Sequence, residues 1–205
     1  MPHSLIAGMT CCGKSSVAKL LIPRWRKRTW NGKPYRIALL DPLRDPSWPL
    51  ADGDCAFTNA DQFLLYCKSS IDKPLAIFVD EGAQTLARGV DYNWLTTQAR
   101  HWGHESHIIS QRPTDLTPQV RGNCEWLYLF QTDCNAAKLL SMEWNQPALL
   151  EAVKNQRLHL HLARRLAETH RYKVDFATKT LVFLGDACTP IQKRSASRSK
   201  RVKSF

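Results

Sequence analysis

The sequence lacks the features that would place this chain in a membrane or in an oxidising compartment. No window of its 205 residues reaches the run of about eighteen apolar residues that a membrane-spanning helix needs. The chain does not begin with the charged and then apolar layout of a signal peptide. Its seven cysteines form no C-x-x-C pair, and their number is odd, so a disulfide scaffold is not indicated. We therefore expect a protein that stays in a reducing cytoplasm.

Acidic residues are outnumbered by basic ones and are absent from the end of the chain. The formal net charge is +11, which favours a polyanionic partner or an anionic surface. Six lysines and arginines and no acid lie in the serine-rich segment 189–205, which we expect to be disordered when free. This tail is either a solubilising terminus or a nonspecific contact to nucleic-acid phosphates, and the sequence favours neither.

Internal repeats are missing as well, and a hydrophobic content of 43% is enough for one substantial core. Short apolar runs alternate with helical patterns along the chain. The apolar runs lie at 3–7, 35–40, 55–58, 74–79, 106–110 and 126–131. The helical patterns lie at 14–28, 60–68, 92–101 and 136–142. This alternation predicts an α/β fold in which helices cover both faces of a mostly parallel sheet. We expect one domain over residues 1–188 and a separate basic tail over 189–205.

The end of the predicted domain is expected to decorate this core. A helical stretch at 148–168 precedes two β-like runs at 172–176 and 180–184, which we interpret as a terminal hairpin. His159 and His161 alternate with leucines, and we place them on a helix face.

A phosphate-binding loop is the strongest motif in the chain. The segment has the pattern Gly-x-x-x-x-Gly-Lys-Ser and lies between a predicted strand and a predicted helix, which is the context of a P-loop. Backbone N–H groups of such a loop converge on the phosphates of ATP, and the following helix N-terminus adds partial positive charge. The expected nucleotide-binding residues are Gly8, Met9, Thr10, Cys11, Cys12, Gly13, Lys14, Ser15 and Ser16. Among them, Lys14 would reach the β- and γ-phosphates, and Ser15 would offer its hydroxyl to Mg²⁺.

Two carboxylates follow the predicted strand 74–79. Because parallel strands end at the same sheet edge, Asp80 and Glu81 are expected on the edge that carries the P-loop. Asp80 would hold Mg²⁺ through water, and Glu81 would polarise the attacking water as general base. The alternative is that both are surface acids that cap the next helix.

An amide follows the predicted strand 106–110. Gln111 would sense the γ-phosphate or position water at the same edge; by itself it would be a hydrogen-bonded turn residue. A small-molecule kinase of this size would carry an arginine-rich lid, and no such signature is present. Asp41, after the second predicted strand, lies near the nucleotide or forms a turn. The spacing of His101, His104 and His107 is a weak indication of metal, because Gly103 interrupts it.

The P-loop, the run Phe78-Val79-Asp80-Glu81 and the segments "ARHWGHESHIISQRP" and "TPQVRGNCEWLYLFQTD" together resemble the FtsK/HerA superfamily of P-loop ATPases. Within it, they are most similar to the genome-packaging ATPases of tailless icosahedral double-stranded DNA viruses. The resemblance spans about two thirds of the chain. It implies a three-layer α-β-α, RecA-like (ASCE) core with a mostly parallel central sheet, to which we add the C-terminal helix and hairpin.

The same resemblance implies a function and partners. It points to an enzyme that hydrolyses ATP with Mg²⁺, translocates double-stranded DNA and packages it into a preformed capsid. The implied partners are DNA, the capsid or its packaging vertex, and copies of the chain in a ring of five or six subunits, in the host cytoplasm and with the virion. A neighbouring subunit would contribute a catalytic arginine, for which the candidates are Arg88, Arg100 and Arg121.

Two alternatives stay open at this point. The zonula-occludens-toxin-like assembly ATPases of filamentous phages share the runs "VDEGAQ" and "RHWGH", although they usually continue into a transmembrane helix. In the other alternative, the chain is a DNA-binding protein whose DNA affinity is switched by ATP with little turnover.

Overall fold

The structure, a computed structural model of the chain, describes residues 3–86, 90–165, 169–175 and 180–186. Arg88 and the basic tail 189–205 lie outside these residues. The division into a domain and a tail therefore remains a prediction.

A single large sheet forms the middle of the molecule, with the strand order β11-β10-β9-β8-β1-β7-β6-β4-β5. Its parallel part consists of β1 (His3–Ala7), β4 (Arg36–Leu40), β5 (Cys55–Phe57), β6 (Leu75–Val79), β7 (Glu105–Ser110) and β8 (Cys124–Leu129). Beyond β8 the sheet continues with antiparallel pairs through β9 (His159–Arg164), β10 (Thr169–Asp175) and β11 (Thr180–Asp186). The six strands of the parallel part correspond to the six apolar runs of the sequence.

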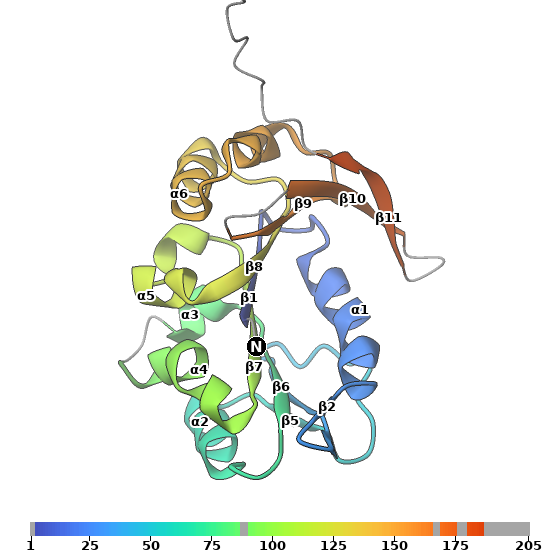
Figure 1. The fold of residues 1–205 in the computed structure, drawn as a ribbon, viewed down its shortest axis with the longest axis vertical. Helices are drawn as coiled ribbons and strands as arrows, with labels where there is room; N and C mark the ends of the chain where they lie inside the picture. Colours follow the sequence, from blue (N-terminus) through green and yellow to red (C-terminus); the bar gives the residue numbers. More distant parts are fainter. Residues whose placement is uncertain (1–2, 87–89, 166–168, 176–179, 187–205) are drawn as a thin grey trace, which may run out of the picture.

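Helices cover both faces of this sheet (Figure 1). On one face lies α1 (Lys14–Arg26), together with a small hairpin of β2 (Thr29–Trp30) and β3 (Lys33–Pro34). The other face carries α2 (Ala60–Ser69), α3 (Gly82–Leu86), α4 (Trp94–Thr97), α5 (Pro118–Gly122) and α6 (Cys134–Trp144). Short 3-10 helices are η1 (Val90–Asn93), η2 (Ala99–Trp102), η3 (Pro113–Asp115) and η4 (Pro147–Lys154). The predicted three-layer α/β architecture is confirmed.

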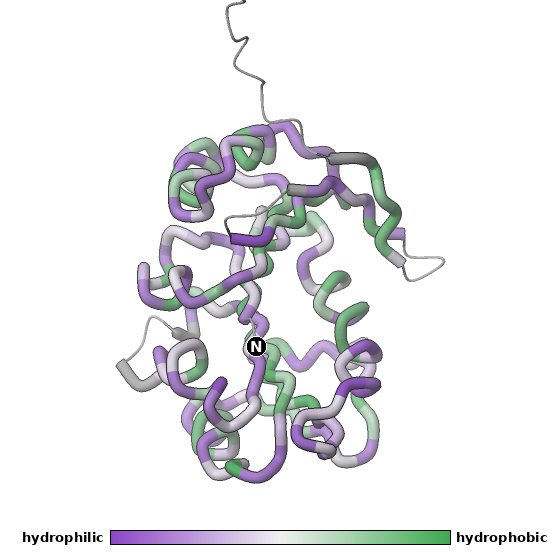
Figure 2. The backbone as a smooth tube through the Cα atoms, in the orientation of Figure 1, coloured by the Kyte–Doolittle hydropathy of each residue, from purple (hydrophilic) through white to green (hydrophobic). Residues whose placement is uncertain are grey.

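The two faces of the sheet bury two separate apolar clusters. Because side chains alternate along a strand, Ala38 and Leu40 of β4 pack on the face of α2, whereas Ile37 and Leu39 pack on the face of α1. Figure 2 shows apolar residues concentrated in the central strands and along α1, with polar residues in many connecting loops. Local signals start the helices: the Asn59 and Asp133 side chains accept hydrogen bonds from the first turns of α2 and α6.

The predicted helix over 148–168 is wrong. Residues Pro147–Lys154 form a 3-10 helix, a turn follows, and strand β9 begins at His159, so that His159 and His161 lie on a strand and not on a helix face. The physical reason is the period of two in His-Leu-His-Leu: Leu160 and Leu162 pack toward α1, while β8 and β10 pair with β9 on its two sides. The expected hairpin exists as β10 and β11, but it extends the sheet and does not merely decorate the core.

Within the described ranges, none of the helices has the length and the apolar character that crossing a membrane requires.

Candidate nucleotide-binding site

The order of the strands explains why three distant motifs meet. Strand β7 lies between β1 and β6 and is parallel to both. The residue that follows β7, Gln111, therefore lies between the loop that follows β1 and the carboxylates that follow β6. Ligands of open α/β sheets bind at this carboxyl edge.

The loop between β1 and α1 has a backbone that its glycines permit. Gly8 and Gly13 have φ angles of 150° and 107°, which favour glycine. A Cβ atom on Gly8 would lie 2.6 Å from the Phe130 Cβ, so the loop packs directly against the end of β8. The Met9 N–H donates to the Gln131 carbonyl oxygen at 2.8 Å, and the Gly8 N–H donates to the Ser110 carbonyl oxygen at 3.3 Å. The loop is thus tied to both neighbouring strands.

Lys14 and Ser15 begin α1, and the first turn of this helix carries no acidic residue. The Lys14 ammonium is largely buried, and its Nζ donates to the Met9 carbonyl oxygen at 2.8 Å. The Ser15 Oγ lies 3.5 Å from the Asp80 Oδ2. The N-terminus of α1, the Lys14 ammonium group and the Ser15 hydroxyl group therefore lie together at the start of the helix. This arrangement suits the binding of a negatively charged phosphate chain.

The Asp80 carboxylate beside this loop is a suitable oxygen ligand for a divalent cation. Burial raises the pKa of Asp80 above its ordinary value, and the nearby carboxylates of Glu81 and Asp41 raise it further, whereas Lys14 lowers it. Mg²⁺ takes one or two protein oxygens, together with waters and substrate phosphates, so Ser15 and Asp80 are a fitting donor set. Asp41 forms the turn that was considered for it, because its carboxylate accepts from the Leu43 and Asp45 N–H groups, and it lies near enough to Asp80 to raise the pKa of that carboxyl.

Gln111 connects the loop with Glu81. Its Nε2 donates to the Glu81 Oε1 at 2.7 Å, and its Oε1 accepts from the Thr10 hydroxyl at 2.9 Å. The result is a continuous hydrogen-bonded chain from Thr10 through Gln111 to Glu81. A water molecule held beside the phosphates would meet both an amide and a carboxylate.

The backbone at Glu81 is held in a costly conformation. Its φ angle is 52°, in the left-handed region that residues other than glycine rarely adopt. The next residue, Gly82, packs so closely on β7 that a Cβ would lie 2.7 Å from the Ile108 Cγ2 and 3.0 Å from the Ile109 carbonyl oxygen. This close approach of α3 to β7 brings Glu81 within reach of Gln111. Strain of this kind often accompanies functional sites.

Two residues that the sequence analysis missed line the same site. A cavity of about 210 Å³ is formed by loop residues including Gly13, Lys14 and Ser16 and, from the turn before β9, by Arg157 and Leu158. Leu158 has a φ angle of 69°, and its Cδ2 would lie 3.1 Å from a Cβ on Gly13. The break between the helical and the alternating pattern near residue 156 was the one available signal for this turn.

The three candidate arginines have different surroundings. Arg100 is exposed and lies near His3, at the edge where β1 begins and opposite the edge that carries the P-loop. Arg121 is buried: its Nε and Nη2 donate to the Glu143 carboxylate at 2.7–3.1 Å, and its Nη1 donates to the Pro113 and Leu116 carbonyl oxygens. The structure therefore argues against Arg121 as a residue offered to a neighbouring subunit. Arg88 is outside the described residues.

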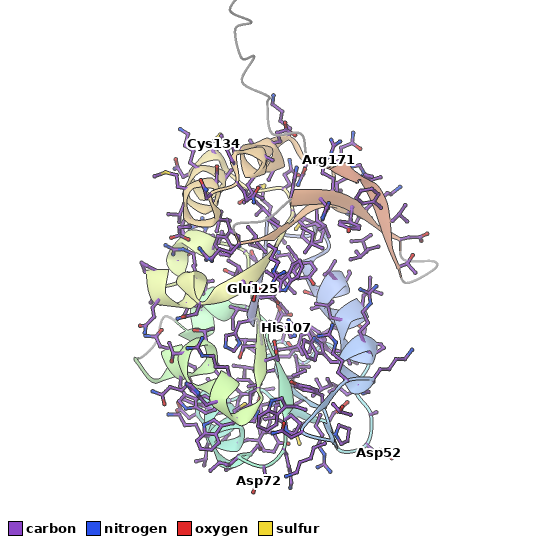
Figure 3. The ribbon with its side chains drawn as sticks, in the orientation of Figure 1. Asp52, Asp72, His107, Glu125, Cys134 and Arg171 are labelled. Carbon is purple, nitrogen blue, oxygen red and sulfur yellow. The ribbon has the colours of Figure 1, made fainter. Side chains whose placement is uncertain are left out.

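The histidine series does not form a metal site. The His104 ring bonds the Leu75 N–H and the Cys67 carbonyl oxygen, and the His107 Nδ1 lies 2.6 Å from the Ser4 hydroxyl. Figure 3 shows His107 in the middle of the sheet. Burial lowers the pKa of both rings, that of His104 to about 4 and that of His107 to about 3. Among the residues that the structure describes, no group of three or more His, Cys, Asp or Glu side chains could hold a metal ion.

No protein-family model matches the sequence, and no curated protein matches it either. Among solved structures, the chain is similar to the genome packaging NTPase B204 from Sulfolobus turreted icosahedral virus 2 in complex with ATP-gammaS. The identity is 17% and the TM-score 0.61, over 91% of this chain and 98% of that chain. B204 from Sulfolobus turreted icosahedral virus, described as a DNA-packaging ATPase, has 15% identity and a TM-score of 0.55, over 89% of this chain and 96% of that chain.

A structure from a different setting has the same fold. Thermomonospora curvata EccC (ATPases 2 and 3), in complex with a signal sequence peptide, has 14% identity and a TM-score of 0.61, over 84% of this chain and 36% of that chain. At such identities the likeness establishes the fold. The function has to be argued from the site.

Proposed function

We propose that this protein is an ATP-hydrolysing motor that moves double-stranded DNA into a viral capsid. The observation that carries the hydrolytic part is the hydrogen-bonded chain Thr10–Gln111–Glu81, which joins the P-loop to a carboxylate. A protein that only binds nucleotide needs the loop but has no need of this connection.

Each residue of the site has a role that follows from its position. The Lys14 ammonium and the N-terminus of α1 bind the phosphate chain and offset its negative charge as the terminal phosphate leaves. Glu81 accepts a proton from the attacking water, and Gln111 orients that water. Mg²⁺, held by Ser15 and Asp80, would supply charge neutralisation between the phosphates.

The part of the proposal that concerns DNA and the capsid has a different support. The chain matches nearly the whole length of B204, a DNA-packaging ATPase, and the net charge of +11 suits a polyanion. The implied partners are duplex DNA, the capsid or its packaging vertex, and a ring of identical subunits, located in the host cytoplasm and with the virion. DNA-stimulated phosphate release distinguishes this motor from a DNA-binding protein that ATP only switches.

Two substitutions test the assignment of the site. Lys14→Ala is expected to abolish ATP binding, because it removes the fixed charge that faces the β- and γ-phosphates. Glu81→Gln is expected to retain ATP binding and to lower the hydrolysis rate by roughly 10² to 10⁴, the usual contribution of a general base. Equilibrium nucleotide binding and phosphate release are the two measurements.

Lys138→Gln is the matched control, because it removes a positive charge from an exposed position on α6. Normal turnover by Glu81→Gln would show that the base is a different residue.

A further inference from the structure

A second polar cavity, of about 300 Å³, lies where η4 meets β9 and β10. Its lining includes Lys154 and Arg171, whose cations are opposed by the single carboxylate of Glu151, together with Asn155 and His161. Figure 3 shows Arg171 at the end of the molecule that η4, β9 and β10 form. The turn before β9 contributes Asn155 and Gln156 to this cavity and the next two residues, Arg157 and Leu158, to the nucleotide cavity.

The His161 ring presents a hydrogen-bond donor to this region. The Asn155 Nδ2 donates to the Leu129 carbonyl oxygen at 3.3 Å, which orients the amide, and it lies 3.1 Å from the His161 Nδ1. An amide nitrogen only donates, so the His161 Nδ1 must accept, and a neutral ring then carries its proton on Nε2. The ring is neutral because burial, aided by the Arg171 charge, lowers the pKa of His161 to about 4.

This donor has no acceptor in the described part of the chain. The His161 Nε2 is buried without a hydrogen-bond partner among the described residues, and His161 as a whole is 1% exposed. His161 also lines the cavity, and buried N–H groups in proteins are generally paired, so an acceptor that enters the cavity is a partner for this donor once the ring turns toward it.

The cations of Lys154 and Arg171 are likewise without a partner among the residues that the structure describes. Within the described parts of the chain, no salt bridge or hydrogen bond to the Lys154 ammonium or to the Arg171 guanidinium is found, and both side chains are exposed. Because His161 pairs with Arg171 and His159 pairs with Lys173, the Lys173 side chain lies on the same sheet face, one pleat further along β10. Positive charge therefore continues along this face beyond the cavity.

We propose that this cavity binds a phosphate group, which Arg171 and Lys154 attract and to which the His161 Nε2–H donates a hydrogen bond. The group can come from inorganic phosphate or from a nucleic-acid backbone. The continuation of charge to Lys173 favours the backbone, and that source rests on the proposed function, whereas the inorganic source does not. Neither source requires ATP hydrolysis.

The first experiment measures the affinity for duplex DNA at several salt concentrations by fluorescence anisotropy. Lys154→Gln and Arg171→Gln are each expected to weaken binding regardless of base sequence and to reduce the log-log salt slope by about 0.9, the value for one lost phosphate contact. Glu151→Gln is expected to tighten binding, since it removes the opposing charge. Lys138→Gln, the matched lysine on α6, is expected to leave both quantities unchanged.

The second experiment uses inorganic phosphate and protein carrying Lys14→Ala, so that the P-loop does not compete for the anion. In histidine ¹H–¹⁵N spectra, the His161 Nε2 signal should shift saturably with phosphate, and Arg171→Gln should abolish the shift. The His161 signal of Arg171→Gln without phosphate shows whether this variant is folded, and the exposed Lys154→Gln serves if Arg171→Gln melts early.

The outcomes separate the sources and the hypotheses. A His161 shift with unchanged DNA affinity assigns the cavity to free phosphate, and weakened DNA binding in both variants assigns it to the backbone. An unmoved His161 signal together with unchanged DNA slopes overturns the proposal. Neither experiment measures ATP turnover. A wrong ATPase assignment would therefore be detected separately, in the nucleotide binding and phosphate release of Lys14→Ala and Glu81→Gln.

Discussion

Two carboxyl groups, one half-buried and one fully buried, show how position sets the chemistry of a residue. Asp80 follows β6 and lies near Lys14, whose positive charge offsets its negative charge. Glu105 begins β7, is completely buried, and neither of its carboxyl oxygens has a hydrogen-bond partner among the described residues. Burial raises the pKa of Glu105 to about 8, so this side chain is held as a neutral acid at pH 7.

Glu105 should make stability depend on pH. Its pKa is 4.5 ordinarily and about 8 in the folded protein, so between these values the folded state binds more protons than the unfolded state. The free energy of unfolding therefore falls as pH rises through this window, by a few kcal/mol in order of magnitude. Glu105→Gln should remove the dependence and be the more stable protein at pH 9.

Urea unfolding at pH 6.5, 8 and 9 measures this effect. The measurements start at pH 6.5 because burial lowers the pKa values of His3, His104 and His161 from 6.5 to about 4. These histidines therefore make the free energy of unfolding depend on pH only below pH 6.5. Glu125→Gln, which changes a less buried acid on β8, is the control. Parallel pH curves for wild type and Glu105→Gln would contradict the prediction.

At the scale of elements, buried arginines hold the helices of one face together. Arg121 at the end of α5 pairs with Glu143 of α6. Arg165, which follows β9, donates to the Arg121 and Glu143 carbonyl oxygens, and its guanidinium lies 4.2 Å from the centre of the Trp144 ring. These contacts attach α5 and α6 to the antiparallel end of the sheet.

Arg121→Ala is accordingly expected to destabilise the fold rather than to remove a catalytic group. The loss should be about 3 kcal/mol, the lower end of the range for breaking a buried ion pair, because the Glu143 side chain remains 24% exposed. Arg100→Ala, at an exposed position, should change stability by no more than about 0.5 kcal/mol. Thermal and urea unfolding of the two variants compare them directly, and an equal loss in both would be evidence against the structural role.

At the scale of the whole molecule, the P-loop and the exposed Arg100 belong to opposite edges of the sheet. One copy therefore cannot bring this arginine to its own loop. The catalytic role proposed for Arg100 accordingly requires a second copy of the chain, as in the proposed ring.

Mixing experiments test that arrangement. Arg100→Ala or Arg88→Ala, mixed with Lys14→Ala, should recover ATPase activity, since some interfaces then combine an intact loop with an intact arginine. A mixture of Lys14→Ala with Glu81→Gln should stay inactive, because both changes affect one loop and its own carboxylate. Absence of recovery for both arginines, with assembly verified, would count against catalysis between subunits.

The basic tail, residues 189–205, is expected to contribute to the affinity for DNA and not to ATP hydrolysis. If its six positive charges all met phosphates, its contribution to the log-log salt slope on duplex DNA would be about −5. Deleting residues 189–205 should flatten that slope and leave basal ATPase activity near normal, because the proposed catalytic residues lie far upstream. An unchanged slope would mean that other residues hold DNA and that the tail docks on another anionic surface.

The sequence by itself determined the chemistry that depends on backbone and on neighbours along the chain. The P-loop could be predicted because Gly8, Gly13 and Lys14 act through local conformation and a helix N-terminus. Asp80 and Gln111 could be predicted because parallel strands deliver their ends to one edge. The alternation of apolar runs and helices likewise predicted the layers, since a sheet that is buried on both faces needs such runs.

Only the tertiary structure decided which side chains that are distant in the sequence, and belong to no common motif, lie close together in space. It turned residues 159–164 into a strand, because pairing with β8 and β10 outweighs the weak helical preference of a short segment. The turn before this strand places Arg157 at the cavity beside the P-loop, and the strand itself places His161 at the cavity between η4, β9 and β10. The tertiary structure also pairs Arg121 with Glu143. A buried arginine needs an acidic partner, and the sequence does not show which acid along the chain folds against it.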